Sequence, residues 1–150
     1  MSADAESDAL ARATAARLRS RDRAVAALGY EILEVTAGFA RIGMVVRHDM
    51  LNGHDIAHGG MVFALADTAL AYAANSHNVV SVTQQASIVF LSPAKEGETL
   101  IAEASERALA GRSGVYDVSV RSADGRAVAM LHGLTRGTSE SVVDTRHSRS

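Results

Sequence analysis

The chain of 150 residues has no cysteine, no tryptophan and a single proline, and aromatic residues make up only 4% of it. Without cysteine, the sequence excludes disulfide bonds, thiolate nucleophiles and cysteine ligands for a metal. No apolar run reaches the roughly 18 residues of a membrane-spanning helix. The first residues are acidic and alanine-rich, and they lack the basic segment followed by an apolar one that is typical of a signal peptide. We therefore expect a cytoplasmic protein that does not bind a membrane.

Net charge is also small: it is −2, although 21% of the residues are charged. A weakly acidic chain gives no electrostatic reason to expect nucleic acid or an anionic lipid surface as a partner. The hydrophobic content of 47% is ordinary for a globular protein, and 150 residues are enough to bury a substantial core in one domain.

Helix and strand patterns divide the chain into three parts. Strong helix formers predict a helical extension over residues 1–28, which Gly29 ends. The domain over residues 29–137 contains one long helix at 58–75. Its strand-like runs lie between turn signals, at residues 30–35, 39–46, 80–91, 99–108, 114–122 and 127–135. The polar tail over residues 138–150 is predicted to be disordered.

The helix predicted at residues 58–75 is apolar almost all round, which is typical of a helix buried on most sides. Consecutive strands joined by short turns form an antiparallel sheet. We therefore expect an α+β fold in which a sheet of about five to six strands wraps around this central helix. Because an open sheet has edges that are usually paired or covered, self-association through an edge is also expected.

The central helix begins with His58-Gly59-Gly60. The first N–H groups of a helix lack internal partners and carry the positive end of its dipole. Without side chains, Gly59 and Gly60 let a substrate oxygen approach those groups, as in an oxyanion hole. The simpler interpretation of the dipeptide alone is a tight turn into the helix, because glycine's conformational freedom explains most such pairs.

Asp67 is a carboxylate among apolar neighbours of the same helix. An unpaired carboxylate is costly to bury, and it holds a proton more tightly there, which suits a general base. The alternatives are a side chain that faces solvent through a gap, or one that bonds to Thr68 or to a nearby amide. The sequence alone does not choose among them.

Helix geometry separates Gly59 from Asp67. Eight residues at about 1.5 Å each put the two about 12 Å apart along the helix axis, so one small reacting group cannot touch both on one helix. If both act in one reaction, two copies of the chain contribute, with their central helices antiparallel about a twofold axis. This hypothesis predicts an obligate dimer with two composite sites.

The other polar residues near the helix have simpler explanations. Asn52 in an Asn-Gly pair is typical of a turn, and Thr83 is typical of strand packing. Three histidines lie before the helix or at its start, at His48, His54 and His58. Their spacings of six and four match no standard zinc pattern, so no metal site is expected. A Ser-His-Asp hydrolase is not indicated, since the sequence has no G-x-S-x-G turn.

Two stretches resemble a known family. Residues 52–76, which contain His58-Gly-Gly and the Leu-Ala-Asp-Thr-Ala run around Asp67, resemble the signature of hotdog-fold acyl-CoA thioesterases. Residues 92–98, Ser-Pro-Ala-Lys-Glu-Gly-Glu, are similar to a strand-end motif of that family. Within the family, the chain is most similar to the phenylacetic-acid-degradation (PaaI-type) group, and the resemblance covers about residues 28–137.

The resemblance implies a hotdog fold that pairs into homodimers and usually into homotetramers. It implies that Asp67 is the catalytic general base or nucleophile, and that the Gly59 amide polarises the thioester carbonyl from the opposite subunit. Asn52 matches the position that places the carbonyl or the water. Thr83 matches a position near the attacking water, and His58 matches a supporting histidine of the motif.

The resemblance also implies a CoA thioester as substrate and no separate cofactor. The candidate contacts to the substrate and its CoA part are Gly60, Lys95, Arg112, Ser113 and Arg136. For the charged members, ordinary solvated surface is an equally good explanation. The apolar candidates for an acyl pocket are Phe63, Leu65, Leu70 and Tyr72.

The sequence therefore predicts hydrolysis of phenylacetyl-CoA, or of a hydroxylated or related aryl- or acyl-CoA, to the free acid and CoA in phenylacetate catabolism. Three alternatives stay open. A hotdog acyl-thioester dehydratase or hydratase normally uses a histidine base, and the helix has none beside Asp67. A non-catalytic acyl-CoA binder has little use for a poorly solvated acid. A structural oligomer without a ligand leaves Asp67 and the glycine pair unexplained.

Overall fold

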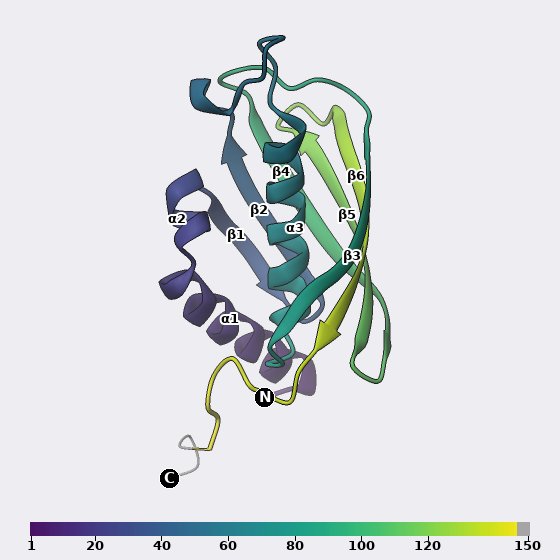
Figure 1. Cartoon of the computed structure of the whole chain (residues 1–150). Helices are drawn as coiled ribbons and strands as arrows, with labels where there is room; N and C mark the ends of the chain where they lie inside the picture. The colour runs from purple at the N-terminus through teal and green to yellow at the C-terminus, as the bar shows by residue number, and fades with distance from the viewer. Residues whose placement is uncertain (147–150) are drawn as a thin grey trace.

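The structure, a computed structural model, describes residues 1–146. Two N-terminal helices precede the sheet domain, α1 (Ala3–Arg21) and α2 (Arg23–Leu28). The elements that follow are β1 (Glu31–Thr36), β2 (Phe39–Val45), the 3-10 turn η1 (His48–Met50), α3 (Gly59–Asn75), β3 (Ser81–Phe90), β4 (Thr99–Ala110), β5 (Ser113–Ser122) and β6 (Ala127–Gly137). The strands form one antiparallel sheet in the order β1-β2-β4-β5-β6-β3, which curves around α3 (Figure 1). This is the α+β architecture expected from the sequence.

The predicted turns form where glycine permits them. Gly38 joins β1 to β2 with φ 74°, and Gly125 joins β5 to β6 with φ 93°. L-residues with a side chain rarely adopt this left-handed region. Both turns therefore depend on glycine, as the sequence pattern indicated.

One face of α3 packs closely on the concave face of the sheet. Leu65, Ala66, Ala69 and Leu70 are fully buried in this contact. Leu70 lies so close to β6 that a Cβ built on Gly133 would overlap its Cδ1 atom. Glycine at position 133 therefore sets how near the helix comes to the sheet.

The opposite face of α3 is not fully covered within one chain. Ala64, Asp67, Thr68 and Ala71 are only half-buried, and their three- and four-residue spacing puts them on one side of the helix. We call these four residues the open stripe. The sequence predicted a helix that is buried on most sides. The open stripe is more exposed than that, because the sheet covers only the other side of α3.

The N-terminal extension forms two helices where the sequence pattern indicated one. Ser2 caps α1 and Asp22 caps α2, each by accepting a backbone N–H from three residues further on. Gly29 ends α2 with φ 69°, as expected. Asp22 also accepts a hydrogen bond from the Tyr72 hydroxyl at 3.2 Å, which ties the extension to α3. Among the helices of residues 1–146, none has both the length and the apolarity needed to cross a bilayer.

The chain after β6 differs from the disordered tail predicted from its polar composition. The Asn78 side chain donates to the Val143 carbonyl at 3.0 Å and accepts from its N–H at 2.8 Å. Val80, just before β3, exchanges backbone hydrogen bonds with the tail at 2.8 and 2.9 Å. Composition alone does not reveal these partners. Residues 147–150 of the predicted tail lie outside the described residues.

Candidate active site

Asp67 lies in the middle of α3 on the open stripe, and its side chain is bonded to the sheet. Its Oδ1 accepts a hydrogen bond from the Thr83 hydroxyl of β3 at 2.7 Å. Thr68, the neighbour considered from the sequence, instead donates to the Ala64 carbonyl at 2.6 Å. No ion pair involves Asp67 within residues 1–146. Thr83 therefore orients one carboxylate oxygen and leaves the other available.

A β-bulge in β3 turns Thr83 toward α3. The pairing of β3 with β6 shifts register between Thr83 and Gln85. After the bulge, Ala86 and Ile88 are half-buried. Before the bulge, Thr83 is half-buried. Strict alternation backward from Ile88 would put Thr83 on the outer face of the sheet. Bulges re-aim side chains in this way, and no sequence signal marks this one.

The first turn of α3 leaves one backbone donor free. His58 is the N-cap residue, and its Nδ1 accepts from the Gly60 N–H at 2.8 Å, so the neutral ring carries its proton on Nε2. The His58 carbonyl accepts from Met61 and Val62. Within residues 1–146, the Gly59 N–H has no acceptor. Gly59, and not Gly60, therefore retains a donor for a ligand.

A cleft of about 460 Å³ opens beside this free N–H. Its apolar lining includes Ile56, Val62, Phe90, Leu91, Pro93 and Val128. Its polar lining comes from Asn52, Gly59 and Ser92. We call it the Gly59 cleft. A Cβ on Gly59 would lie 3.1 Å from Cζ of Phe90, so glycine also allows the ring to close over the helix start.

Asn52 forms the predicted turn and also lines the Gly59 cleft. Its Oδ1 accepts from the His54 N–H at 2.9 Å, and its own N–H donates to the Ile56 carbonyl at 2.8 Å. The side-chain NH₂ has no acceptor within residues 1–146. Asn52 can therefore hold the turn with its oxygen and donate to a ligand with its nitrogen.

Within residues 1–146, no three histidine, aspartate or glutamate side chains lie close enough together to bind a metal ion.

All four apolar residues expected around an acyl group lie outside the Gly59 cleft. Leu65 and Leu70 are fully buried beneath the sheet, and Tyr72 is 2% exposed and donates to Asp22. None of these three lines the Gly59 cleft, and neither does Phe63. The cleft instead uses the end of β3 and Val128. These residues come together only through the β3–β6 pairing, which has no local sequence signal.

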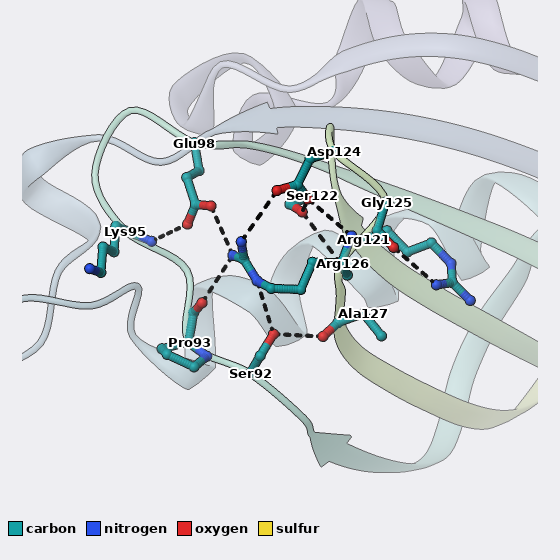
Figure 2. Close-up of polar contacts among 10 residues, drawn as sticks. All are labelled: Ser92, Pro93, Lys95, Glu98, Arg121, Ser122, Asp124, Gly125, Arg126 and Ala127. Carbon is teal, nitrogen blue, oxygen red and sulfur yellow. Dashed lines mark hydrogen bonds and ion pairs between the residues drawn. The ribbon is translucent and has the colours of Figure 1, made fainter.

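The candidate contacts to CoA fall at two ends of the molecule. Lys95 follows β3, near the N-terminal end of α3, and its side chain points away from the neighbouring polar cluster (Figure 2). Ser113 and Arg136 pair across β5 and β6 near the other end of α3. Arg112, next to Ser113, lines a smaller cavity of about 210 Å³ there. A single chain therefore does not bring these residues together.

Residues 54–129 match the thioesterase superfamily. The chain is 42% identical to the acyl-coenzyme A thioesterase PaaI of Escherichia coli (strain K12), over 75% of this chain and 80% of that protein. The chain belongs to the thioesterase superfamily. This thioesterase is also 35% identical to a putative esterase of Archaeoglobus fulgidus, over 79% of this chain and 77% of that protein.

Solved structures agree with the family assignment. This thioesterase superposes on the E. coli PaaI protein from the phenylacetic acid degradation operon with a TM-score of 0.88 and 36% identity, over 89% of this chain and 97% of that chain. A hypothetical thioesterase with coenzyme A from Streptococcus pneumoniae TIGR4 gives a TM-score of 0.72 and 27% identity, over 75% and 90% of the two chains. The predicted hotdog fold and thioester hydrolase class are confirmed, and the enzyme is PaaI-like.

Proposed function

We propose that this enzyme hydrolyses phenylacetyl-CoA, or a hydroxylated or related aryl- or acyl-CoA thioester, to the free acid and CoA. The observation that carries the proposal is the 2.7 Å hydrogen bond from Thr83 to Asp67 on the open stripe. A hydroxyl orients a carboxylate without pairing it with a positive charge. Such a carboxylate can accept a proton as a general base or attack a carbonyl carbon as a nucleophile. The name of the E. coli relative and the coenzyme A in the S. pneumoniae structure support an acyl-CoA substrate.

Asp67 drives the chemistry by one of two routes. As a general base, it takes a proton from water while the water oxygen attacks the thioester carbonyl carbon. The tetrahedral intermediate then breaks its C–S bond, and Asp67 returns the proton to the CoA thiolate. As a nucleophile, Asp67 attacks the carbon itself, the CoA thiolate leaves, and water hydrolyses the acyl anhydride. In both routes the oxyanion faces the Gly59 N–H, where the α3 dipole also favours negative charge.

Asn52 and His58 support this arrangement in the proposal. Asn52 lines the cleft, and its free NH₂ orients the carbonyl or the water. His58 caps α3 through Gly60 and so keeps the first turn, with the Gly59 N–H, pointing into the cleft. Neither residue transfers a proton.

The Gly59 cleft suits the acyl part of the substrate. Its walls are mainly apolar, and its polar groups are few and include the Gly59 N–H. Ligand pockets of this kind bury an apolar body and fix its orientation with a few polar contacts. An aryl or alkyl group in this cleft keeps its carbonyl at the helix start.

The complete site is formed by a homodimer in this proposal. Gly59 and Asp67 lie about 12 Å apart along one helix, so they cannot serve the same carbonyl. Among the strands of residues 1–146, the edge strand β3 pairs only with β6, and its residues Val82 and Val89 are 59% and 57% exposed. A partner β3 that adds antiparallel to this edge brings the two open stripes together. Gly59 of the partner subunit then lies opposite Asp67.

The same arrangement gathers the candidate CoA contacts. When two α3 helices run antiparallel, the C-terminal end of one lies near the Gly59 cleft of the other. Arg112, Ser113 and Arg136 then come from one subunit and Lys95 from its partner. Cations and free N–H groups of this kind bind phosphates well. Pairing of two dimers into a homotetramer completes the proposed assembly.

The first test is thiol release from a panel of CoA esters by the purified protein and its Asp67→Asn variant. Because Asn keeps the shape but loses the charge, we expect kcat to fall about 10²–10⁴-fold while the unfolding temperature changes little. Phenylacetyl-CoA is expected among the best esters. An Asp67→Asn variant that keeps most of its turnover would contradict the role of Asp67.

A matched pair of variants at Gly59 tests the amide. His58 has φ −59° and ψ 135°, which a following proline accepts, and proline is favoured at the first helical position. Gly59→Pro removes the N–H, whereas Gly59→Ala adds a Cβ and keeps it. We expect Gly59→Pro to lose about 10²–10³-fold more kcat than Gly59→Ala, as for an oxyanion donor. Equal losses would mean that the amide is not the donor.

Mixed dimers then decide whether the site spans two subunits. In a heterodimer of Asp67→Asn and Gly59→Pro chains, one composite site is doubly defective and the other is intact. We expect about half of the wild-type activity per dimer, from two nearly inactive parents. If both groups act within one subunit, every site is defective and the heterodimer stays inactive.

A further inference from the structure

Arg126, at the turn before β6, holds together two loops that are far apart in the sequence (Figure 2). Its Nη2 donates to the Pro93 carbonyl at 3.1 Å and to Glu98 Oε1 at 2.8 Å. Its Nε donates to the Ser92 hydroxyl at 3.3 Å, and its Nη1 lies 3.7 Å from Asp124. We call these five residues the Arg126 cluster. Ser92, Pro93 and Glu98 belong to the stretch 92–98 that resembles a family motif, but nothing in the sequence indicated Arg126 as their partner.

The segment that Arg126 holds is a wall of the Gly59 cleft. Ser92, Pro93 and Ala94 line the cleft after β3 has ended. On the cleft side, the Ala94 carbonyl accepts from the Ala57 N–H at 2.7 Å. On the other side, this segment contacts the turn before β6 and the first residues of β6. The Ser92 hydroxyl donates to the Ala127 carbonyl at 2.6 Å. Arg126 is therefore one of the contacts that hold this wall in place, and it is the one that also reaches Glu98.

The charges of the cluster favour this position. Glu98 accepts from the Lys95 N–H and from Arg126, and these hydrogen bonds, the backbone one first, lower the pKa of Glu98. Glu98 thus stays ionised and keeps Arg126 in place at neutral pH. The planar guanidinium reaches a carboxylate, a carbonyl and a hydroxyl at once, which a lysine cannot reproduce.

We propose that Arg126 is a positioning residue that fixes the Ser92–Ala94 wall and thereby sets the preference of the enzyme for the size of the acyl group. This inference rests on the proposed function, because it takes the Gly59 cleft as the acyl site. Arg126 lies outside the cleft lining and acts through the wall. A loosened wall binds a large acyl group less tightly, and it does so equally in the ground state and in the transition state. Such a loss raises KM and leaves kcat unchanged.

The test compares Arg126→Gln with Arg121→Gln, using phenylacetyl-CoA and acetyl-CoA as substrates. Arg121 is in the same hairpin, but within residues 1–146 its side chain makes one hydrogen bond, to the Gly125 carbonyl at 3.3 Å. For Arg126→Gln we expect KM for phenylacetyl-CoA to rise about tenfold, with kcat and the KM for acetyl-CoA within about twofold of wild type. Arg126→Lys is expected to lie between, and Arg121→Gln to match wild type.

Amide hydrogen exchange supplies a readout that does not depend on turnover. Leu91 donates to the Val128 carbonyl and Gly97 to the Val46 carbonyl, so their exchange reports on the two ends of the wall. We expect faster exchange at both in Arg126→Gln than in Arg121→Gln. If exchange and the KM ratio of the two esters stay unchanged while the wild type is active, this inference is overturned and the proposed function stands. A wild type that hydrolyses none of the CoA esters of the panel overturns both.

Discussion

The two long faces of α3 differ in what their residues do for the protein. On the sheet side, Leu65, Ala69 and Leu70 are fully buried and serve packing alone. On the open stripe, Asp67 is half-buried and accepts a hydrogen bond from Thr83. Asp67 is the only carboxylate of this helix, and it lies on the face that the fold leaves open. A helix that looks uniformly apolar in sequence therefore combines a core face with a reactive face.

Leu70→Ala gives the largest stability effect that this comparison predicts. The substitution leaves a cavity between α3 and the sheet, so we expect a loss of about 2–5 kcal/mol in the free energy of unfolding. The measurement is urea unfolding at one fixed protein concentration, since subunit association would shift the midpoint.

The matched control for Leu70→Ala is Ala71→Ser on the open stripe. Ala71 is the next residue but half-buried, so we expect a change within about 0.5 kcal/mol. Comparable losses for the two variants would show that both faces are packed alike. That result would remove the distinction between the core face and the open stripe.

Thr83→Val has an intermediate effect, and activity is the quantity to measure. Valine keeps the shape and removes the hydroxyl that orients Asp67. A hydrogen bond to a charged group contributes about 1.5–3 kcal/mol, so we expect kcat to fall at least about tenfold. Thr83→Ser keeps the hydroxyl and should retain most of the turnover. Equal activity of the two variants would leave Thr83 with a packing role only.

Much of the fold follows from patterns along the chain. Alternating strands, glycine turns and one apolar helix predict the antiparallel sheet around α3, and the family resemblance points to Asp67 and to the start of α3. The remaining features depend on long-range pairing. The bulge after Thr83, the contact of Gly133 with Leu70 and the wall held by Arg126 each join segments that local propensity does not connect.

Asp117 gives the smallest expected effect and the closest contrast with Asp67. Both carboxylates are half-buried, but Asp117 accepts from His132 Nδ1 and from Arg107 Nε, each at 2.7 Å. These partners, His132 first, lower the pKa of Asp117. A carboxylate with such partners stabilises the fold, whereas one held only by a hydroxyl remains available for chemistry.

The pH dependence of stability tests the role of Asp117. Because the pKa of Asp117 is lower in the folded state, its stabilisation is complete above the ordinary value of about 4 and is lost as pH falls through the folded value. Since its side chain is 40% exposed, we expect Asp117→Asn to cost only about 0.2–1 kcal/mol at pH 7. The difference from wild type should shrink toward pH 3, with kcat unchanged. A difference that persists at low pH would show that lost packing, and not charge, explains the effect.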